Sequence, residues 1–280
     1  MGKKKMSIQG LREMKSQDQK FTMITAYDYP TAVLVDQSPI ELILVGDSLG
    51  MTMLGYDSTV PVTMEEMIHH LKPVVRGARN TFIVGDMPFG SYNESTSQAV
   101  HNANRIMKEG MADCIKLEGG VSIATTVKAM VEGGIPVMGH IGLTPQTASL
   151  LGGFKVQGKD AESARRLLED ALAMEAAGAF SVVMECVPTP LARMITAKLR
   201  IPTIGIGAGP HCNGQVLVYH DLVGLYQRFT PKFVKQYANL GKEVSTALEK
   251  FSQEVVNGSF PGPEHSFGMS EEVLNELKEF

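Results

Sequence analysis

Five short apolar segments of this 280-residue chain end in residues whose side chains can take part in chemistry. Four of the segments end in an acid and one ends in histidine; these final residues are Asp47, Asp86, Glu118, Glu185 and His140. Continuous apolar runs of this length are typical of strands buried on both faces of a parallel sheet. A charge inside such a sheet is costly, so each residue is expected where its strand ends. Because ligands bind at the carboxyl ends of parallel strands, the pattern predicts one shared site.

Three of the acids, Asp47, Asp86 and Glu118, indicate a metal site. The ends of neighbouring strands converge in a barrel, and three carboxylates there would repel one another unless a cation or protons intervened. Ligands that are all oxygen suit Mg²⁺ or another hard divalent ion, which keeps water and substrate in its shell. The alternative is that each acid caps the following helix or pairs with a nearby base, which explains a single acid better than all three.

Two further polar residues lie beside these acids. Ser48 could donate a hydrogen bond to a substrate carboxylate, or it could cap a helix or turn. Lys116 lies two residues before Glu118, so both side chains should point to the same face of their strand. A lysine inside a barrel needs an anionic partner, either Glu118 or a substrate carboxylate, and we favour the substrate.

Glu185 and His140 are candidates for proton transfer and charge stabilisation. A glutamate among apolar residues should have a raised pKa and could act as a general base. Its alternative role is a buried salt bridge to the next strand, but the segment 201–206 contains no lysine or arginine. His140 could donate a hydrogen bond to a developing oxyanion, or it could be a structural histidine.

The glycine-rich segment 205–209 reads GIGAG and follows the seventh strand-like run. Its spacing does not match the dinucleotide-binding pattern GxGxxG. In a barrel, such a loop could present backbone N–H groups to an anion, and a plain tight turn is the competing interpretation.

These residues require a scaffold that brings distant segments to one rim. Strand-like runs begin near Thr22, Leu42, Phe82, Cys114, Pro136, Ser181, Pro202 and Val216, with helical segments between most of them. Eight such alternations predict a (β/α)8 barrel, with a doubly wound open sheet as the rival fold. We expect one domain over 1–280, with 231–280 as a helical extension that covers one end of the barrel or packs a subunit interface. Its first helix is expected over 233–251.

The composition limits the partners and the compartment. The formal net charge is −4, from 26 basic and 30 acidic residues, which argues against a nucleic-acid or anionic-membrane surface. Three cysteines without a CxxC pair favour a reducing compartment over a disulfide framework. Because no stretch of about 18 apolar residues occurs, we expect no membrane span and a cytoplasmic protein.

Motifs along nearly the whole chain resemble those of the ketopantoate hydroxymethyltransferase family. They are VGDSLGM at 45–51, GYDST at 55–59, PVT at 61–63, GDMPF at 85–89, KLEGG at 116–120, GHIGLTPQ at 139–146, GFKVQG at 153–158, GIGAG at 205–209 and PGPEHSF at 261–267. The resemblance implies a TIM barrel of the phosphoenolpyruvate/pyruvate superfamily, assembled as a homodecamer. It implies transfer of a hydroxymethyl group from 5,10-methylenetetrahydrofolate to 2-oxoisovalerate, through a Mg²⁺-stabilised enolate, to give ketopantoate for pantothenate biosynthesis.

The resemblance also implies roles for individual residues. Asp47 and Asp86 bind one Mg²⁺ per subunit directly, and Glu118 holds it through water. Ser48 and Lys116 contact the substrate carboxylate, and Asp47 and Asp86 face the substrate through the metal. Glu185 accepts the proton from the substrate carbon.

Two rival functions remain at this point. One is another Mg²⁺-dependent lyase or mutase of the same superfamily, although the chain lacks the Lys-Lys-Cys-Gly-His loop that some of these enzymes carry. The other is a non-catalytic binding protein that retains the barrel, which should have lost its rim acids.

Overall fold

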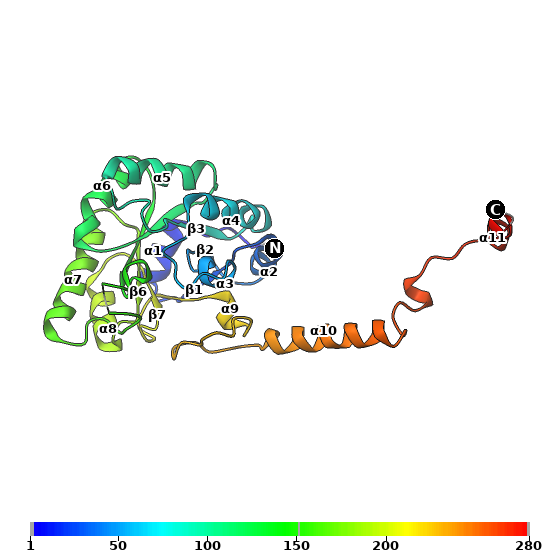
Figure 1. Cartoon of the computed structure of the whole chain (residues 1–280). Coiled ribbons are helices and arrows are strands. Elements are labelled where there is room, and N and C mark those ends of the chain that lie inside the picture. Colours follow the sequence, from blue (N-terminus) through cyan, green and yellow to red (C-terminus); the bar gives the residue numbers. More distant parts are fainter. Residues whose placement is uncertain (1–2, 151, 279–280) are drawn as a thin grey trace.

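The computed structural model describes residues 3–150 and 152–278 and contains a closed barrel of parallel strands in sequence order (Figure 1). The strands are β1 (Phe21–Thr25), β2 (Leu42–Val45), β3 (Phe82–Asp86), β4 (Cys114–Glu118), β5 (Val137–Gly142), β6 (Ser181–Glu185), β7 (Thr203–Ile206) and β8 (Gly214–Leu217). β1 pairs with β8, so no edge strand remains. The predicted barrel is confirmed, the open sheet is wrong, and every strand begins within two residues of its expected start.

Most helices lie around the barrel or between its strands, and the last two belong to the C-terminal segment. The helices are α1 (Ile8–Ser16), α2 (Tyr29–Gln37), α3 (Leu49–Thr52), α4 (Met64–Gly77), α5 (Thr96–Lys108), α6 (Ala124–Glu132), α7 (Ala161–Ala176), α8 (Thr189–Lys198), α9 (Tyr219–Leu222), α10 (Leu240–Val256) and α11 (Glu271–Lys278). Thr63 caps α4 in a capping box with Glu66, and Asp160 caps α7. These side chains accept hydrogen bonds from N–H groups that have no partner inside the helix. None of the helices in the described ranges has both the length and the apolar character that a membrane span requires.

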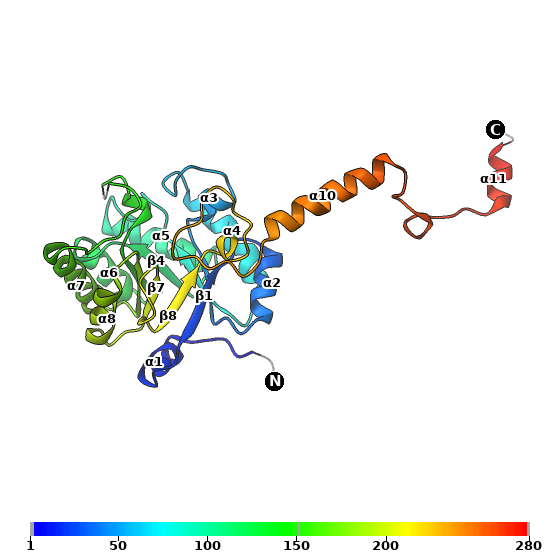
Figure 2. The same ribbon diagram turned by 90° about the horizontal axis from the view of Figure 1, so that it is seen from below.

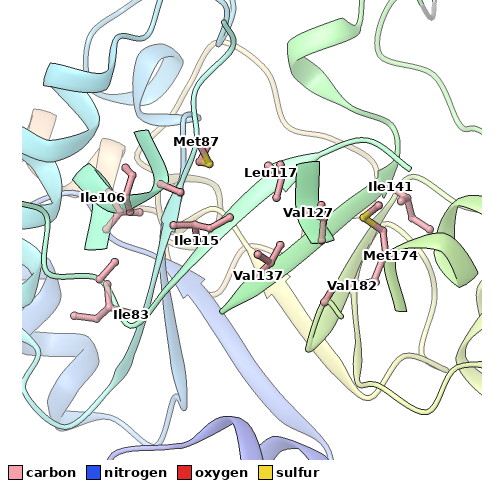
Figure 3. Close-up of a cluster of buried hydrophobic side chains, with 14 of the residues drawn as sticks. Ile83, Met87, Ile106, Ile115, Leu117, Val127, Val137, Ile141, Met174 and Val182 are labelled. Atoms are coloured by element: carbon pink, nitrogen blue, oxygen red, sulfur yellow. The ribbon is translucent and has the colours of Figure 1, made fainter. Parts of the chain in front are cut away.

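The apolar core has two parts. The larger one lies between the strands and the outer helices, where strand residues such as Ile115 and Val137 pack with Ile106 of α5 and Met174 of α7 (Figure 3). The second fills the interior of the barrel around Phe21 and includes Leu11 of α1. Figure 2 shows α1 below the N-terminal ends of β1 and β8. One end of the barrel is thus closed by packing, which leaves the C-terminal end for a site.

The C-terminal segment leaves the barrel. α10 projects away from it in two views, and Gly241 is the one described residue of this helix that is buried (Figures 1 and 2). The helix begins at Leu240 after the cap Asn239 and runs to Val256, so the expected range 233–251 was placed too early. The expectation that the extension covers a barrel end applies only to its first residues, because Lys232 and Phe233 line the cavity at the mouth.

Candidate active site

A cavity of about 540 Å³ opens at the C-terminal mouth of the barrel. Its lining includes all seven residues that the sequence predicted for the site: Asp47, Ser48, Asp86, Lys116, Glu118, His140 and Glu185. They come from the ends of β2, β3, β4, β5 and β6, so segments 138 residues apart in the chain meet at one rim. This is the position at which barrels of this kind place their catalytic side chains.

Strand register sets the contacts between these side chains. Asp86 lies opposite Lys116, and Glu118 lies opposite His140, in the parallel pairs β3–β4 and β4–β5. Asp47 follows the end of β2 by two residues, and its backbone N–H donates to Asp86 Oδ2 at 3.1 Å. The sheet therefore places the first two acids directly beside each other.

Lys116 forms a buried ion pair with Asp86. Its Nζ lies 2.7 Å from Asp86 Oδ1, and the two side chains are 4% and 1% exposed. Burial opposes the charge on Lys116, but Asp86, Glu118 and Asp47 outweigh it and raise the lysine pKa. Glu118, the alternative that the sequence offered to a substrate carboxylate, does not form the direct pair. The pair forms across strands because in-register residues of neighbouring parallel strands lie closer than residues two apart on one strand.

The ionised form of Asp47 is disfavoured by burial and by the acids around it. Burial, followed by the charges of Asp86 and Glu118, raises the pKa of its carboxyl well above the usual range, and Lys116 opposes this only in part. One lysine faces three buried acids here. A bound cation or a proton on Asp47 would relieve the repulsion.

Gln146 and Tyr92 complete the acid cluster and were not predicted as site residues. Gln146 Nε2 donates to Asp47 Oδ2 at 2.8 Å, and Gln146 N donates to Glu118 Oε2 at 3.1 Å. Tyr92 donates its hydroxyl proton to Gln146 Oε1 at 2.6 Å. Tyr92 lies in a loop and Gln146 in a single 3-10 turn, Pro145–Thr147, and neither is long enough for a periodic pattern to mark a polar residue as buried.

His140 lies between two glutamates. Its Nδ1 is 3.3 Å from Glu118 Oε1, and its Nε2 is 3.3 Å from Glu185 Oε2. Nε2 makes no hydrogen bond in the described residues, so its contact with Glu185 is an ion pair rather than a directed bond. Burial and Lys116 oppose the charge on His140, but Glu118 and Glu185 raise its pKa to about 9. Glu185 therefore has a cationic partner in His140. This partner lies on β5, the preceding strand, and not on β7, the following one.

The side chain of Ser48 is not used to cap a helix and lines the cavity. It makes no side-chain cap of α3, so that interpretation was wrong, and its Oγ lies 2.8 Å from the Tyr27 hydroxyl. Asp28, by contrast, caps α2 through the backbone N–H of Thr31 and lies outside the cavity lining.

The glycine-rich loop after β7 is a tight turn packed against neighbours. Gly207 and Gly209 have φ of +64° and +79°, and a side chain at either position would meet Phe233 or Thr189. These contacts explain the glycines without a ligand, so the turn interpretation has direct support.

The acid cluster fits a hard divalent cation in its donor type. Asp47 and Asp86 offer carboxylate oxygens only, and Asp86 Oδ1 is buried with no well-directed hydrogen bond despite the nearby lysine. Over residues 3–150 and 152–278, no three Asp, Glu, His or Cys side chains are already gathered in a metal-binding arrangement. Gln146 and Lys116 contact the oxygens that an ion would use, so binding would require these side chains to adjust.

Comparisons with known proteins agree on one family. Residues 5–263 match the family model described as ketopantoate hydroxymethyltransferase. The 3-methyl-2-oxobutanoate hydroxymethyltransferase of Heliobacterium modesticaldum is 66% identical over 270 residues, which cover 96% of this chain and 98% of the relative. The enzyme of that name from Carboxydothermus hydrogenoformans is 55% identical over 273 residues, covering 98% and 99%.

Solved structures share the fold at low identity. A phosphonopyruvate hydrolase in complex with oxalate and Mg²⁺ has a TM-score of 0.61 and 11% identity, covering 97% of this chain and 95% of the hydrolase. A 2,3-dimethylmalate lyase, a member of the PEP mutase/isocitrate lyase superfamily, has a TM-score of 0.58 and 16% identity, covering 97% and 95%.

Proposed function

Since this chain belongs to the ketopantoate hydroxymethyltransferase family, we propose that the cavity at its barrel mouth is where the hydroxymethyl group is transferred. The activity of the family is transfer to 3-methyl-2-oxobutanoate, which gives ketopantoate for pantothenate biosynthesis. The observation that carries the proposal is the meeting of seven predicted side chains around one cavity of about 540 Å³. The one-carbon donor in this proposal is 5,10-methylenetetrahydrofolate.

The cofactor in this proposal is Mg²⁺, held by Asp47, Asp86 and Glu118. When bound, the ion polarises the keto group of the substrate and makes the hydrogen on C3 more acidic. Asp47 and Asp86 are adjacent and largely buried, and both line the cavity, so their oxygens can reach one ion. Gln146, which donates to Asp47 and Glu118, orients these two carboxylates.

Lys116 and Ser48 bind the substrate carboxylate in this proposal. Both line the cavity next to the acid cluster, and Lys116 keeps its charge because three acids surround it. A buried ammonium and a hydroxyl donor suit an anionic substrate that would otherwise be repelled by the acids.

Glu185 accepts the proton from C3 of the oxo acid. Its side chain is 15% exposed at the end of β6, so it can reach a ligand in the cavity. His140 lies 3.3 Å from both Glu118 and Glu185 and is placed to stabilise negative charge on the substrate oxygen. The C3 carbon then forms a C–C bond to the methylene carbon of the donor. Both C–N bonds of that carbon, to N5 and N10, break; water supplies its hydroxyl oxygen, and tetrahydrofolate leaves with one proton from C3 and one from water on these two nitrogens.

Replacing the base tests the proposal. We expect Glu185→Gln to lower kcat by about 10²–10⁴-fold, which is the usual contribution of a general base. Exchange of the C3 hydrogen of 3-methyl-2-oxobutanoate with D2O, followed by NMR, should be lost to a similar degree. Glu162→Gln on the exposed face of α7 is the matched control and should leave exchange unchanged. Wild-type exchange in Glu185→Gln would remove Glu185 from this role.

The assembly and compartment complete the proposal. We propose one domain over 1–280 with a helical extension from 231, a homo-oligomer, by family resemblance a decamer, and a cytoplasmic location. The apolar face of α10 that the barrel leaves uncovered supports an assembly, and three unpaired cysteines in the described chain fit a reducing compartment.

A further inference from the structure

Asp221 is a buried acid at the mouth of the barrel that the proposed reaction does not use. It lies on the short helix α9, which follows β8 directly and is tied to β1 by a hydrogen bond from Tyr219 N to Thr25 Oγ1 of 2.9 Å. The residue is 9% exposed and lines the same cavity as the acid cluster. Burial alone raises its pKa to about 6.

The carboxylate of Asp221 makes no hydrogen bond or ion pair with any residue in the described ranges 3–150 and 152–278. Other buried acids of the cavity differ from it, since Asp47 accepts from Gln146 and Asp86 contacts Lys116. Leaving a buried carboxylate without a donor costs stability. Such a group is expected where a ligand supplies the missing donors.

The oxo acid cannot be that ligand. It is an anion with acceptor oxygens only, so the Asp221 carboxylate would repel it. Asp221 requires a neutral or cationic group with N–H donors. The barrel order places β8 four strands from β4 in the closed ring, so Asp221 lies across the mouth from Glu118, with Glu185 on β6 between them.

The cavity has room for a second, larger ligand. Even at the roughly 30 Å³ that one liquid water occupies, the eight non-hydrogen atoms of 3-methyl-2-oxobutanoate would fill less than half of about 540 Å³. The remaining lining is rich in aromatic and apolar side chains; it includes Phe154, Val156, Tyr226, Phe229 and Phe233. Phe154 and Phe229 are 59% and 67% exposed, which is unusual for rings beside a cavity unless a flat ligand covers them.

We propose that Asp221 and these aromatic side chains form the subsite for the pteridine ring of the one-carbon donor. The 2-amino group and N3–H of a tetrahydropteridine are two parallel donors, and a carboxylate accepts both in a bidentate pair. The aromatic side chains provide flat apolar surface for the ring and its aryl substituent. The inference rests on the proposed function, because it takes a tetrahydrofolate as the donor.

The direct test compares tetrahydrofolate with its 2-desamino analogue, which lacks one of the two donors. In the wild-type protein, calorimetric titration should show tetrahydrofolate binding about tenfold or more tightly than the analogue. Asp221→Ala should bind both ligands weakly and equally, and Asp221→Asn should raise the KM for 5,10-methylenetetrahydrofolate by about 10–100-fold. Equal discrimination by Asp221→Ala and the wild type would overturn the proposal.

Two controls distinguish donor binding by Asp221 from a general charge effect and from a role in proton transfer. Asp18→Asn removes one exposed negative charge from a residue outside the cavity lining and should leave donor binding unchanged. Hydrogen exchange at C3 without any folate depends on Glu185 and should stay at the wild-type rate in Asp221→Asn; a loss of exchange would contradict a role confined to the donor.

Stability provides a further readout. Because the Asp221 carboxylate has no protein partner, Asp221→Asn should leave the urea midpoint unchanged or raise it. A structural acid would lose stability on the same substitution, and a clear drop in the midpoint would contradict a ligand-binding role.

Discussion

At the scale of single residues, the buried pair of Lys116 and Asp86 determines both charge and stability at the mouth. We expect Lys116→Met to lower the free energy of unfolding by about 3–5 kcal/mol, because it leaves the Asp86 carboxylate buried and without its cation. Urea unfolding at fixed protein concentration measures the change. Lys128→Met breaks an exposed pair with Glu132 and should change stability by less than about 1 kcal/mol. Equal effects of the two variants would show that burial does not matter here.

Metal binding is also decided by single residues. Binding to the native state alone stabilises a protein by about 2.7 kcal/mol when the ligand is present at 100 times its Kd. We therefore expect Mg²⁺ to raise the Tm of the protein after EDTA treatment and to restore its activity. Asp86→Asn should lose the Tm response, whereas Asp18→Asn, an exposed substitution outside the cavity, should keep it. Full turnover in EDTA would refute the metal site.

The site residues whose position could be predicted from the sequence are those at the ends of strands. Asp47, Asp86 and Glu118 follow apolar runs whose burial is readable, so their position at one rim follows from the fold. Gln146 contacts two of these carboxylates from a single 3-10 turn, and Tyr92 contacts Gln146 from a loop; in such short or irregular segments the sequence does not show which side chains turn inward. Lys116 was predicted to line the site, but its partner depends on the register between β3 and β4, which a single strand does not encode.

At the scale of elements, the strands and the capped helices were predictable because local chemistry defines them. Thr63 and Asp160 mark helix starts by accepting hydrogen bonds from free N–H groups. α10 was misplaced because the segment from 233 contains aromatic and basic residues that suit a helix, while its actual cap is Asn239. Tertiary contacts determine where α10 begins. Tyr237 N donates to Leu222 O at 2.8 Å, and this bond holds the segment before α10 against α9.

The pairing of β5 with β6 positions both His140 and Glu185. One glycine, Gly142, allows the two strands to approach closely at Glu185. Gly142 has φ of +95°, and a Cβ there would clash with the carbonyl oxygen of Glu185. We expect Gly142→Ala to cost about 2–5 kcal/mol of stability, from backbone strain plus overpacking. Because the clash displaces the backbone of the proposed base, kcat should also fall by about tenfold or more.

Gly134→Ala is the matched control for this junction. Gly134 has a similar φ of +84° in the loop before β5, but a Cβ there would meet no atom within 4 Å. Its cost should be limited to about 1–2 kcal/mol of strain, with kcat unchanged. If both variants lost activity equally, the close approach to Glu185 would have no catalytic importance.

At the scale of the whole molecule, most of α10 is exposed within residues 3–150 and 152–278, although Phe251 packs against the ring of Phe260. Apolar residues recur along it at 244, 248, 251 and 255, which form one face, and Leu248 is 64% exposed. Most of the stability of a helix in a protein comes from the packing of its apolar face, which this helix of 17 residues leaves exposed. The composition that indicated a globular protein could not show where this helix would pack, because composition does not specify which surfaces meet.

We expect the apolar face of α10 to pack on a second copy of this chain, and charges placed on that face to break the assembly. Leu248→Glu with Phe251→Glu should shift the protein to smaller species in sedimentation velocity at micromolar concentration, because each glutamate would have to be buried without a partner. Gln253→Glu adds the same charge on the opposite, exposed face of the helix and should leave the sedimentation coefficient unchanged. An unchanged assembly in the double variant would mean that α10 contributes no subunit contact, and the uncovered face would then need another explanation.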